Sequence, residues 1–399
     1  MAPIEIAKGV FWVGVIDWNL RDFHGYETRR GTTYNSYLIL DEKTVLVDTV
    51  KYPFKEMLAE NISEVTALEK LDYIVVNHVE MDHSSSLNHI MQQARNATIV
   101  SSKRGKDGLE KYYGPTNWNF QVVKTGDELN LGTRTLKFIE APMLHWPDSM
   151  FTYLKEDKIL MPNDAFGQHL ATSQRFDDQV DQSLLMDEAA KYFANILMPY
   201  SPLITRKIDE ISKLGIEPKV IAPSHGIIWR NNPEKIVKAY LEWSEGKTQS
   251  KVVIVYDTMW GSTQKMAEAL CDAVGSKGVE VHLFNMRKSD YAEVFKEILE
   301  AKAVIVGSST INSSMLPSIS AFLTYAIGLR PKGKIWACFG SYGWGGGAVK
   351  AMTEQLKTAK FEVLEPGLQV QFAPSREELR ICREFGEKIA DAVQTSNSS

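Results

Sequence analysis

Several features are scarce or missing in this 399-residue chain, and each absence excludes a class of protein. Three cysteines, Cys271, Cys338 and Cys382, are too few and too widely spaced for a disulfide framework, and no Cys-x-x-Cys pair marks an iron–sulfur segment. No run approaches the roughly 18 apolar residues of a membrane-spanning helix. The N-terminus lacks the basic and then apolar layout of a signal peptide. We therefore expect a cytoplasmic protein that does not enter a membrane.

An excess of positive charge is also missing. The chain has 45 basic and 50 acidic residues, a formal net charge of -5. Proteins that bind nucleic acid usually gather Lys and Arg on one face, so we expect no nucleic-acid partner. After position 250 the chain has 17 basic and 16 acidic residues, so the acidic excess belongs to the first part.

The pattern of strands and helices changes near residue 248 and predicts two domains. Residues 1–248 mix short strands, such as those at 10–16 and 33–40, with helices that include a long one over 183–214. This order predicts two β-sheets with helices outside. Residues 251–399 read as five βα units with strongly apolar strands, which is typical of a doubly wound five-stranded parallel sheet.

The most informative segment of the first domain runs from Asn77 to His83. It follows an apolar strand and places His78, Glu80, Asp82 and His83 within six positions. In an extended segment residues i and i+2 point the same way, so His78 and Glu80 can converge on one metal. The next two ligand-type residues can then reach a second metal.

Three further ligand-type residues, His145, Asp164 and His225, each follow another apolar strand. A β-sandwich gathers such loops at one end. The inventory is then sufficient for two metals with Asp164 as the bridge.

The motif HxExDH at residues 78–83, followed by His145, Asp164 and His225 after later strands, is similar to the metal-binding motifs of the metallo-β-lactamase superfamily. Hydrolases of that superfamily usually carry HxHxDH and bind zinc. Here Glu80 stands in place of the second His, and a carboxylate favours iron over zinc. With a flavodoxin-like second domain, the chain resembles the flavodiiron proteins (A-type flavoproteins), which implies an αββα sandwich in the first domain. The resemblance implies that His78, Glu80 and His145 hold one iron and that Asp82, His83 and His225 hold the other, with Asp164 bridging.

Residues close to these ligands are candidates for proton delivery or hydrogen bonding to a substrate. His24 lies in a loop with apolar neighbours and can face the metals from outside their coordination shell. Tyr200 is a second candidate for the same task. His169 follows Asp164 closely and lies either beside the ligands or on the surface.

Three loops of the second domain predict a flavin site. The first βα turn contains hydroxyls at both ends, a glycine, and the start of a helix, which together form a phosphate cradle. It resembles the loop that binds the phosphate of FMN in flavodoxins. The other two loops follow the third and fourth strands, beside the switch point in strand order. The predicted FMN-binding residues are Thr258, Met259, Trp260, Gly261, Ser262, Thr263, Ser309, Thr310, Ile311, Asn312, Ser341, Tyr342, Gly343, Trp344 and Gly345.

A flavin and two ferrous ions together suit the multi-electron reduction of a small diatomic molecule. We expect reduction of NO to N2O and water, with reduction of O2 to water as a second activity, and no residue separates the two on physical grounds. Without a rubredoxin-like segment, the chain is expected to receive electrons from a separate rubredoxin-like or flavin-type donor. The resemblance also implies a head-to-tail homodimer.

Two alternatives remain open. One is a zinc hydrolase in which the flavodoxin-like domain is regulatory, against which Glu80 argues. The other is an electron carrier whose metal site is vestigial.

Overall fold

The computed structural model describes residues 2–396, which divide into two compact units. The first contains the residues up to Phe193 together with Tyr200–Leu241, and the second contains Ala194–Pro199 together with the residues from Glu242 onward. The domain boundary expected at 248–251 stays a prediction. None of the described helices is both long and apolar enough to cross a membrane.

The first unit is built on two sheets with a shared core between them. The larger sheet has seven strands in the order β1-β2-β7-β8-β9-β10-β11, and the smaller has five in the order β12-β13-β14-β15-β16. Apolar residues from both sheets, such as Val47 and Phe138, meet in one buried cluster. The strands of the two sheets are β1 Ile4–Ala7, β2 Val10–Trp12, β7 Tyr37–Ile39, β8 Thr44–Val47, β9 Leu71–Val75, β10 Thr98–Ser101, β11 Asn119–Val122, β12 Glu128–Asn130, β13 Thr135–Glu140, β14 Met150–Leu154, β15 Ile159–Met161 and β16 Val220–Ile221.

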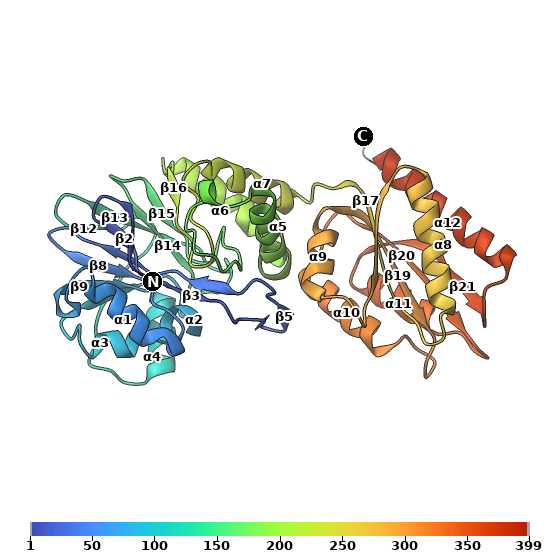
Figure 1. Ribbon diagram of the computed structural model, residues 1–399, viewed down its shortest axis with the longest axis horizontal. Coiled ribbons are helices and arrows are strands. Elements are labelled where there is room, and N and C mark those ends of the chain that lie inside the picture. The colour runs from blue at the N-terminus through green and yellow to red at the C-terminus, as the bar shows by residue number, and fades with distance from the viewer. Residues whose placement is uncertain (1, 397–399) are drawn as a thin grey trace. The chain divides into compact units, whose positions relative to one another are not determined.

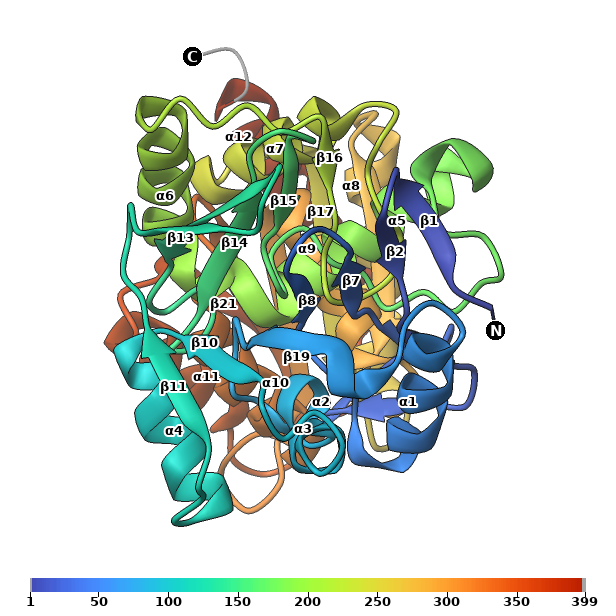
Figure 2. The same cartoon turned by 90° about the vertical axis from the view of Figure 1, so that its left-hand side faces the viewer.

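Helices cover both outer faces of this pair of sheets (Figures 1 and 2). On the larger sheet, Leu58, Ile90 and Leu109 extend a second apolar cluster from three different helices. On the smaller sheet, Lys207 donates a hydrogen bond to the Glu140 carbonyl at 2.6 Å. The helices are α1 Lys55–Ser63, α2 Met81–Ser84, α3 Leu87–Met91, α4 Lys103–Tyr113, α5 Gln182–Tyr192, α6 Ser201–Lys213 and α7 Pro233–Glu245. The expected αββα sandwich is confirmed.

Three predicted elements of the first unit are wrong in detail. The single helix expected over 183–214 is divided by a π turn at Phe193–Leu197 and a 3-10 turn at Met198–Tyr200. Pro199 lacks an N–H and disfavours helical geometry in the residue before it, so the helix ends and restarts there. The single strand expected over 10–16 is also split, into β2 and β3 (Val15–Asp17).

Gly14 lies at the second break. A Cβ on Gly14 would stand 2.3 Å from the Tyr34 carbonyl oxygen, so only glycine allows the two chain segments this close. The same change of direction splits the strand expected over 33–40 into β6 (Thr32–Tyr34) and β7. Two small sheets, β3-β6 and the β4-β5 hairpin (Asp22–Phe23 and Tyr26–Glu27), follow from these breaks.

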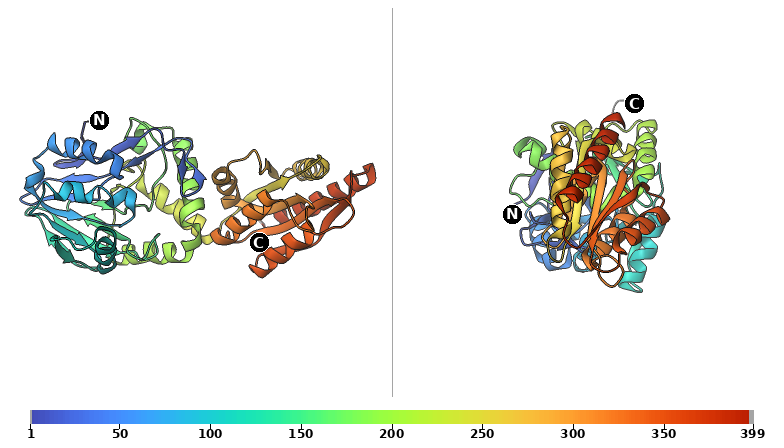
Figure 3. Two further views of the ribbon diagram at one scale, coloured as in Figure 1. Left: turned by 90° about the horizontal axis from the view of Figure 1, so that it is seen from below. Right: turned by 90° about the vertical axis from the view of Figure 1, so that its right-hand side faces the viewer.

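The second unit is the expected doubly wound domain. Its five parallel strands have the order β18-β17-β19-β20-β21, so the direction of winding reverses between β17 and β19. Helices α8 and α12 lie on one face, and α9, α10 and α11 lie on the other (Figures 1 and 3). The strands are β17 Gln249–Asp257, β18 Glu280–Asn285, β19 Ala301–Ser309, β20 Ile335–Tyr342 and β21 Glu362–Gln371. The helices are α8 Ser262–Ser276, α9 Tyr291–Glu300, α10 Pro317–Leu329, α11 Ala348–Thr358 and α12 Arg376–Ser396.

A substitution at Gly307 in β19 tests how tightly this sheet is packed. A Cβ at Gly307 would lie 2.1 Å from the buried ring of Phe339 on β20. We expect Gly307→Ala to destabilise the unit by about 1–3 kcal/mol, the usual range for overpacking. The thermal midpoint measured by circular dichroism should fall. Gly328→Ala is the matched control, because Gly328 is exposed in α10 with no heavy atom within 4 Å of the added Cβ. That change should leave the midpoint level or raise it, and equal falls for both variants would contradict this account.

Candidate functional sites

Seven metal-ligand candidates of the first unit come from four strand ends. His78 and Glu80 lie between β9 and α2, and Asp82 and His83 occupy the first turn of α2. His145, Asp164 and His225 follow β13, β15 and β16. All but His145 are buried, and the His145 side chain is 14% exposed. In each case an apolar strand is followed by a polar segment, and that segment carries the ligand side chains.

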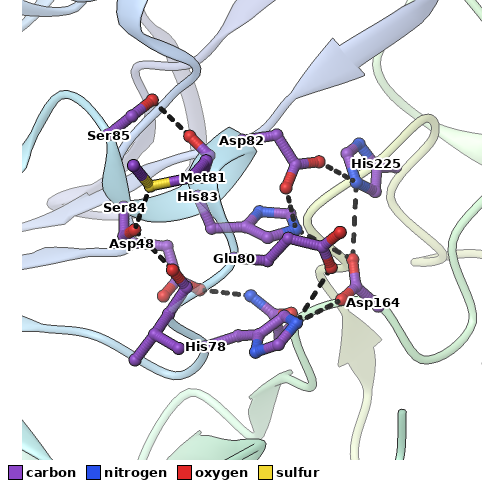
Figure 4. Close-up of polar contacts among 12 residues, drawn as sticks. Asp48, His78, Glu80, Met81, Asp82, His83, Ser84, Ser85, Asp164 and His225 are labelled. Carbon is purple, nitrogen blue, oxygen red and sulfur yellow. Dashed lines mark hydrogen bonds and ion pairs between the residues drawn. The ribbon is translucent and has the colours of Figure 1, made fainter. Parts of the chain in front are cut away.

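These side chains form two groups that share one carboxylate. One ligand atom from each of His78, Glu80, His145 and Asp164 lies within 4.8 Å of the others, and the same holds for Asp82, His83 and His225. Asp164 stands between the groups in Figure 4. Its Oδ2 is 3.4 Å from His145 Nε2, and its Oδ1 is 3.0 Å from His83 Nε2 and 3.4 Å from His225 Nε2.

The donor atoms converge without saturating one another. Both carboxylate oxygens of Asp82, both ring nitrogens of His83 and Oδ2 of Asp164 have no hydrogen-bond partner among the described residues. Two donor atoms bound about 2.1 Å from one metal lie about 3.0–3.4 Å apart. Several of these separations match that spacing, including 3.2 Å between His225 Nε2 and Asp82 Oδ2. The donor set therefore fits two metal ions bridged by Asp164.

The electrostatics of the cluster point the same way. Burial lowers the pKa of each imidazole, but contacts with Asp164 and with Glu80 or Asp82 outweigh it and raise the pKa of His145 to about 9 and that of His225 to about 10. Burial raises the pKa of Asp164, but the charge of His83 and contacts with His145 hold it well below its usual range. Buried carboxylates thus demand neighbouring positive charge, which metal cations supply.

Outer partners orient two of the imidazoles. Asp148 Oδ2 lies 2.9 Å from His78 Nδ1 and accepts a 2.8 Å hydrogen bond from the Val79 backbone N–H. His225 Nδ1 lies 2.7 Å from the Thr33 carbonyl, so it donates there. In both rings Nε2 is left to face the cluster. Sequence reasoning missed Asp148, although it stands only three positions after His145.

A second missed carboxylate, Asp48, ties two ligand loops together. Its oxygens accept from the backbone and side chain of Asn77 at 2.8 and 3.1 Å, and from the Asn163 side chain at 3.2 Å. Asn77 precedes His78, and Asn163 precedes Asp164. Asp48 therefore fixes the spacing between a terminal ligand and the shared one.

His24 reaches the cluster from the turn of the β4-β5 hairpin. Its Nε2 lies 2.6 Å from Glu80 Oε1, and its side chain is 59% exposed. The contact with Glu80 raises the pKa of His24. No polar or ring contact among the described residues joins Tyr200 to the cluster. Tyr192, which sequence reasoning missed, donates instead to Asp164 Oδ1 at 3.2 Å.

His169 is buried rather than superficial. Its ring nitrogens lie 2.9 Å from Thr32 Oγ1 and 2.9 Å from the Tyr26 hydroxyl, and its ring packs 5.1 Å from that of His225. Burial, assisted by the charge of His225, holds the pKa of His169 well below its usual range. It therefore packs as a neutral imidazole behind the cluster.

The second unit has a cavity of about 730 Å³ at the carboxyl ends of its strands. Twelve of the fifteen predicted flavin-binding residues line it, and Thr258, Gly261 and Thr263 lie outside the lining. Sequence reasoning missed Ser313, Phe372 and Ala373. The last two follow β21, whose carboxyl end meets the same edge of the sheet.

The hydroxyls of Ser309 and Ser341 line this cavity beside the N-terminus of α8, and Thr263 lies behind them. Thr263 Oγ1 lies 2.9 Å from Ser309 Oγ and 2.8 Å from Ser341 Oγ, which joins the three loops. Gly261 precedes α8 with φ +85°, a left-handed conformation that favours glycine. The lining contains no charged side chain. An anionic phosphate would therefore be held by hydroxyls, backbone N–H groups and the helix dipole.

Comparison with known proteins extends over both units. Residues 32–226 match the family described as ODP family beta lactamase, and residues 254–386 match the family described as Flavodoxin. The chain is 56% identical to a nitric oxide reductase of Moorella thermoacetica, over 98% of this chain and 99% of that protein.

Solved structures give the same result. The chain is similar to the rubredoxin oxygen:oxidoreductase of Desulfovibrio gigas, with a TM-score of 0.97 and 39% identity over 100% of both chains. It is also similar to the flavodiiron protein of Giardia intestinalis, with a TM-score of 0.96 and 39% identity, over 99% of this chain and 97% of that one.

Asp148 provides a test of the metal cluster. Asp148→Asn keeps the shape of the side chain but removes the charge that faces His78 Nδ1. Changes of such outer partners usually weaken metal binding about 10–100-fold, so we expect a loss in that range. Ferrous iron titrated anaerobically into metal-free protein measures it. Asp209→Asn is the control, because Asp209 forms only an exposed pair with Lys213. Wild-type affinity in Asp148→Asn would contradict the assignment.

Proposed function

Because the chain belongs to the flavodiiron protein family, we propose that it is an oxidoreductase that reduces nitric oxide to nitrous oxide and water, with reduction of O2 to water as a second activity. The observation that carries the proposal is the shared position of Asp164 between two buried donor sets, one of which contains the Glu80 carboxylate. A site with that composition suits two redox-active iron ions.

The two donor sets suggest which residues hold each iron. His78, Glu80 and His145 would bind one ion, and Asp82, His83 and His225 would bind the other. Asp164 would bridge them through its two oxygens. Asp148 and the Thr33 carbonyl would keep the Nε2 atoms of His78 and His225 aimed at the metals.

FMN would occupy the cavity of the second unit. Its phosphate would lie at the N-terminus of α8, next to the hydroxyls of Thr263, Ser309 and Ser341. Tyr342 and Trp344 line the same cavity and would cover the ring of the flavin.

When bound, the irons and the reduced flavin supply two electrons for the conversion of two NO and two protons to N2O and water, or four for the conversion of O2 and four protons to two waters. The chain would relay the protons from solvent. His24 is more than half exposed and contacts Glu80, so its Nε2 would pass protons from solvent to the cluster. The Tyr192 hydroxyl would hold Asp164 in place through Oδ1.

The electrons would come from a separate rubredoxin-like or flavin-type protein. The name of the Desulfovibrio gigas relative supports a rubredoxin as the donor. The second unit also lacks the acidic excess of the first, so an acidic donor would meet less repulsion there.

We also propose a head-to-tail homodimer, in which the flavin of one chain serves the irons of the other. Large apolar side chains support it at both sites. Trp260, Trp344 and Phe372 line the flavin cavity with exposures of 94%, 99% and 64%. Met81 is 42% exposed and lies between Glu80 and Asp82 in the chain, and Met143 is 36% exposed and lies two positions before His145. Exposed apolar groups of this size are typical of protein interfaces.

Composition and turnover test the function together. We expect two irons and one FMN per chain, with NO consumed anaerobically in the presence of a reduced donor, and slower or comparable O2 consumption at equal enzyme. Two zinc ions per chain, with no flavin-dependent turnover, would support the hydrolase instead.

Glu80→Ala separates the enzyme from an electron carrier. The change removes one carboxylate from the metal cluster and leaves the flavin cavity untouched. We expect FMN to be retained and NO consumption to fall by about 10-fold or more. Glu69→Ala is the control, because Glu69 is exposed at a 3-10 turn before β9. Unchanged gas consumption in Glu80→Ala would favour the carrier.

Thr263→Val tests the flavin site in the same way. It keeps the shape of the side chain but removes the hydroxyl that joins Ser309 and Ser341. We expect weaker FMN binding, by about 10-fold if the loss corresponds to about 1.4 kcal/mol. Quenching of flavin fluorescence on titration with flavin-free protein measures the affinity. Thr324→Val on the exposed face of α10 should bind FMN as the wild type does.

A further inference from the structure

The loop that carries His225 is held by hydrogen bonds to three alternate residues of another segment. Thr33 lies in β6, Asn35 in the break between β6 and β7, and Tyr37 at the start of β7, and the side chains of all three reach the His225 loop. Tyr37 donates from its hydroxyl to the Pro223 carbonyl at 2.6 Å, and Thr33 Oγ1 accepts from the Gly226 N–H at 2.6 Å. Asn35 stands between them.

Asn35 makes three hydrogen bonds to this loop, as many as Thr33 and more than Tyr37. Its side-chain Nδ2 donates to the carbonyls of Pro223 at 2.7 Å and Gly226 at 3.1 Å, on either side of His225. Its backbone N–H donates to the Ser224 carbonyl at 2.7 Å. Its Oδ1 accepts from the Trp12 indole N–H at 2.7 Å. Asn35 is fully buried, so water does not compete for these bonds.

The polarity of these partners sets the orientation of the amide. A carbonyl can only accept and an indole N–H can only donate, so Nδ2 must face the loop and Oδ1 must face Trp12. Trp12 is itself fully buried, and the Arg175 guanidinium packs 4.9 Å from its ring. The support behind Asn35 is therefore rigid.

We infer that Asn35 is a positioning residue for the metal centre. By holding the carbonyls before and after His225, it fixes the ring so that Nδ1 meets the Thr33 carbonyl and Nε2 faces Asp82 and Asp164. Asn35 acts only on the donor set that contains His225. The inference rests on the proposed role of His225 as an iron ligand.

The test exchanges the amide for an isosteric carboxylate. Asn35→Asp keeps the volume and the acceptor for Trp12 but replaces both donor bonds to the loop with repulsion between oxygens. Asn61→Asp is the matched control, because Asn61 is buried in the same unit and also donates to two carbonyls, those of Val13 and Gly14, outside the ligand loops. A structural loss alone should affect both variants alike.

Metal-free protein is titrated anaerobically with ferrous iron, and bound iron is counted after desalting. We expect the wild type and Asn61→Asp to keep two irons per chain and Asn35→Asp to keep close to one, with the second bound about 10-fold more weakly or worse. The Mössbauer spectrum of Asn35→Asp should then show an uncoupled iron, and the thermal midpoints of the two metal-free variants should fall by similar amounts.

Two irons at wild-type affinity in Asn35→Asp would overturn the inference, as would equal iron loss in both variants. If Asn35→Asp does not fold, Trp12→Phe takes its place, because it keeps an aromatic ring at this position and removes the indole donor to Asn35 Oδ1 together with part of the buried ring; it should weaken one iron and leave the other. A wild type that binds no iron would instead refute the proposed function itself.

Discussion

The structure of the first unit depends on a concentration of buried charge around Asp164. Three carboxylates and four imidazoles lie in one largely buried cluster, where unpaired charge is costly because little water reaches it. The imidazoles respond with pKa values raised to about 9 for His145 and about 10 for His225, and the carboxylates respond in the opposite direction. Several parts of the fold keep these groups together. They are the surrounding strands, the hairpin that carries His24, and the hydrogen bonds that join Thr33, Asn35 and Tyr37 to the His225 loop.

The flavin cavity follows a different electrostatic plan. Its lining has no charged side chain, and its polar groups are hydroxyls, amides and the N-terminus of α8. Neutral donors can approach a phosphate and a flat ring without creating a buried charge when the cavity is vacant. The second unit can therefore fold around the site before the cofactor arrives, whereas the first unit must balance its carboxylates by protonated imidazoles or by metal.

Sequence reasoning predicted the features that depend on short stretches of chain. His78, Glu80, Asp82 and His83 share one loop, and the loops of the flavin cavity each follow an apolar strand. Asp148, Tyr192 and Phe372 could not be predicted in the same way, because their roles depend on which distant segment they meet after folding. The broken helix at Pro199 was readable from the missing N–H of proline, but the apolar periodicity on both sides of it favoured one continuous helix.

Asp48 has a consequence for how this centre can change over evolutionary time. One carboxylate accepts hydrogen bonds from Asn77 and Asn163, which immediately precede His78 and Asp164. The loop of a terminal ligand and the loop of the bridging ligand are thereby held together, although 86 positions separate the two asparagines in the chain. A substitution that shifts either loop is transmitted to the other, so new metal preferences are reached more readily by exchanging ligands in place, as Glu80 illustrates, than by moving a loop.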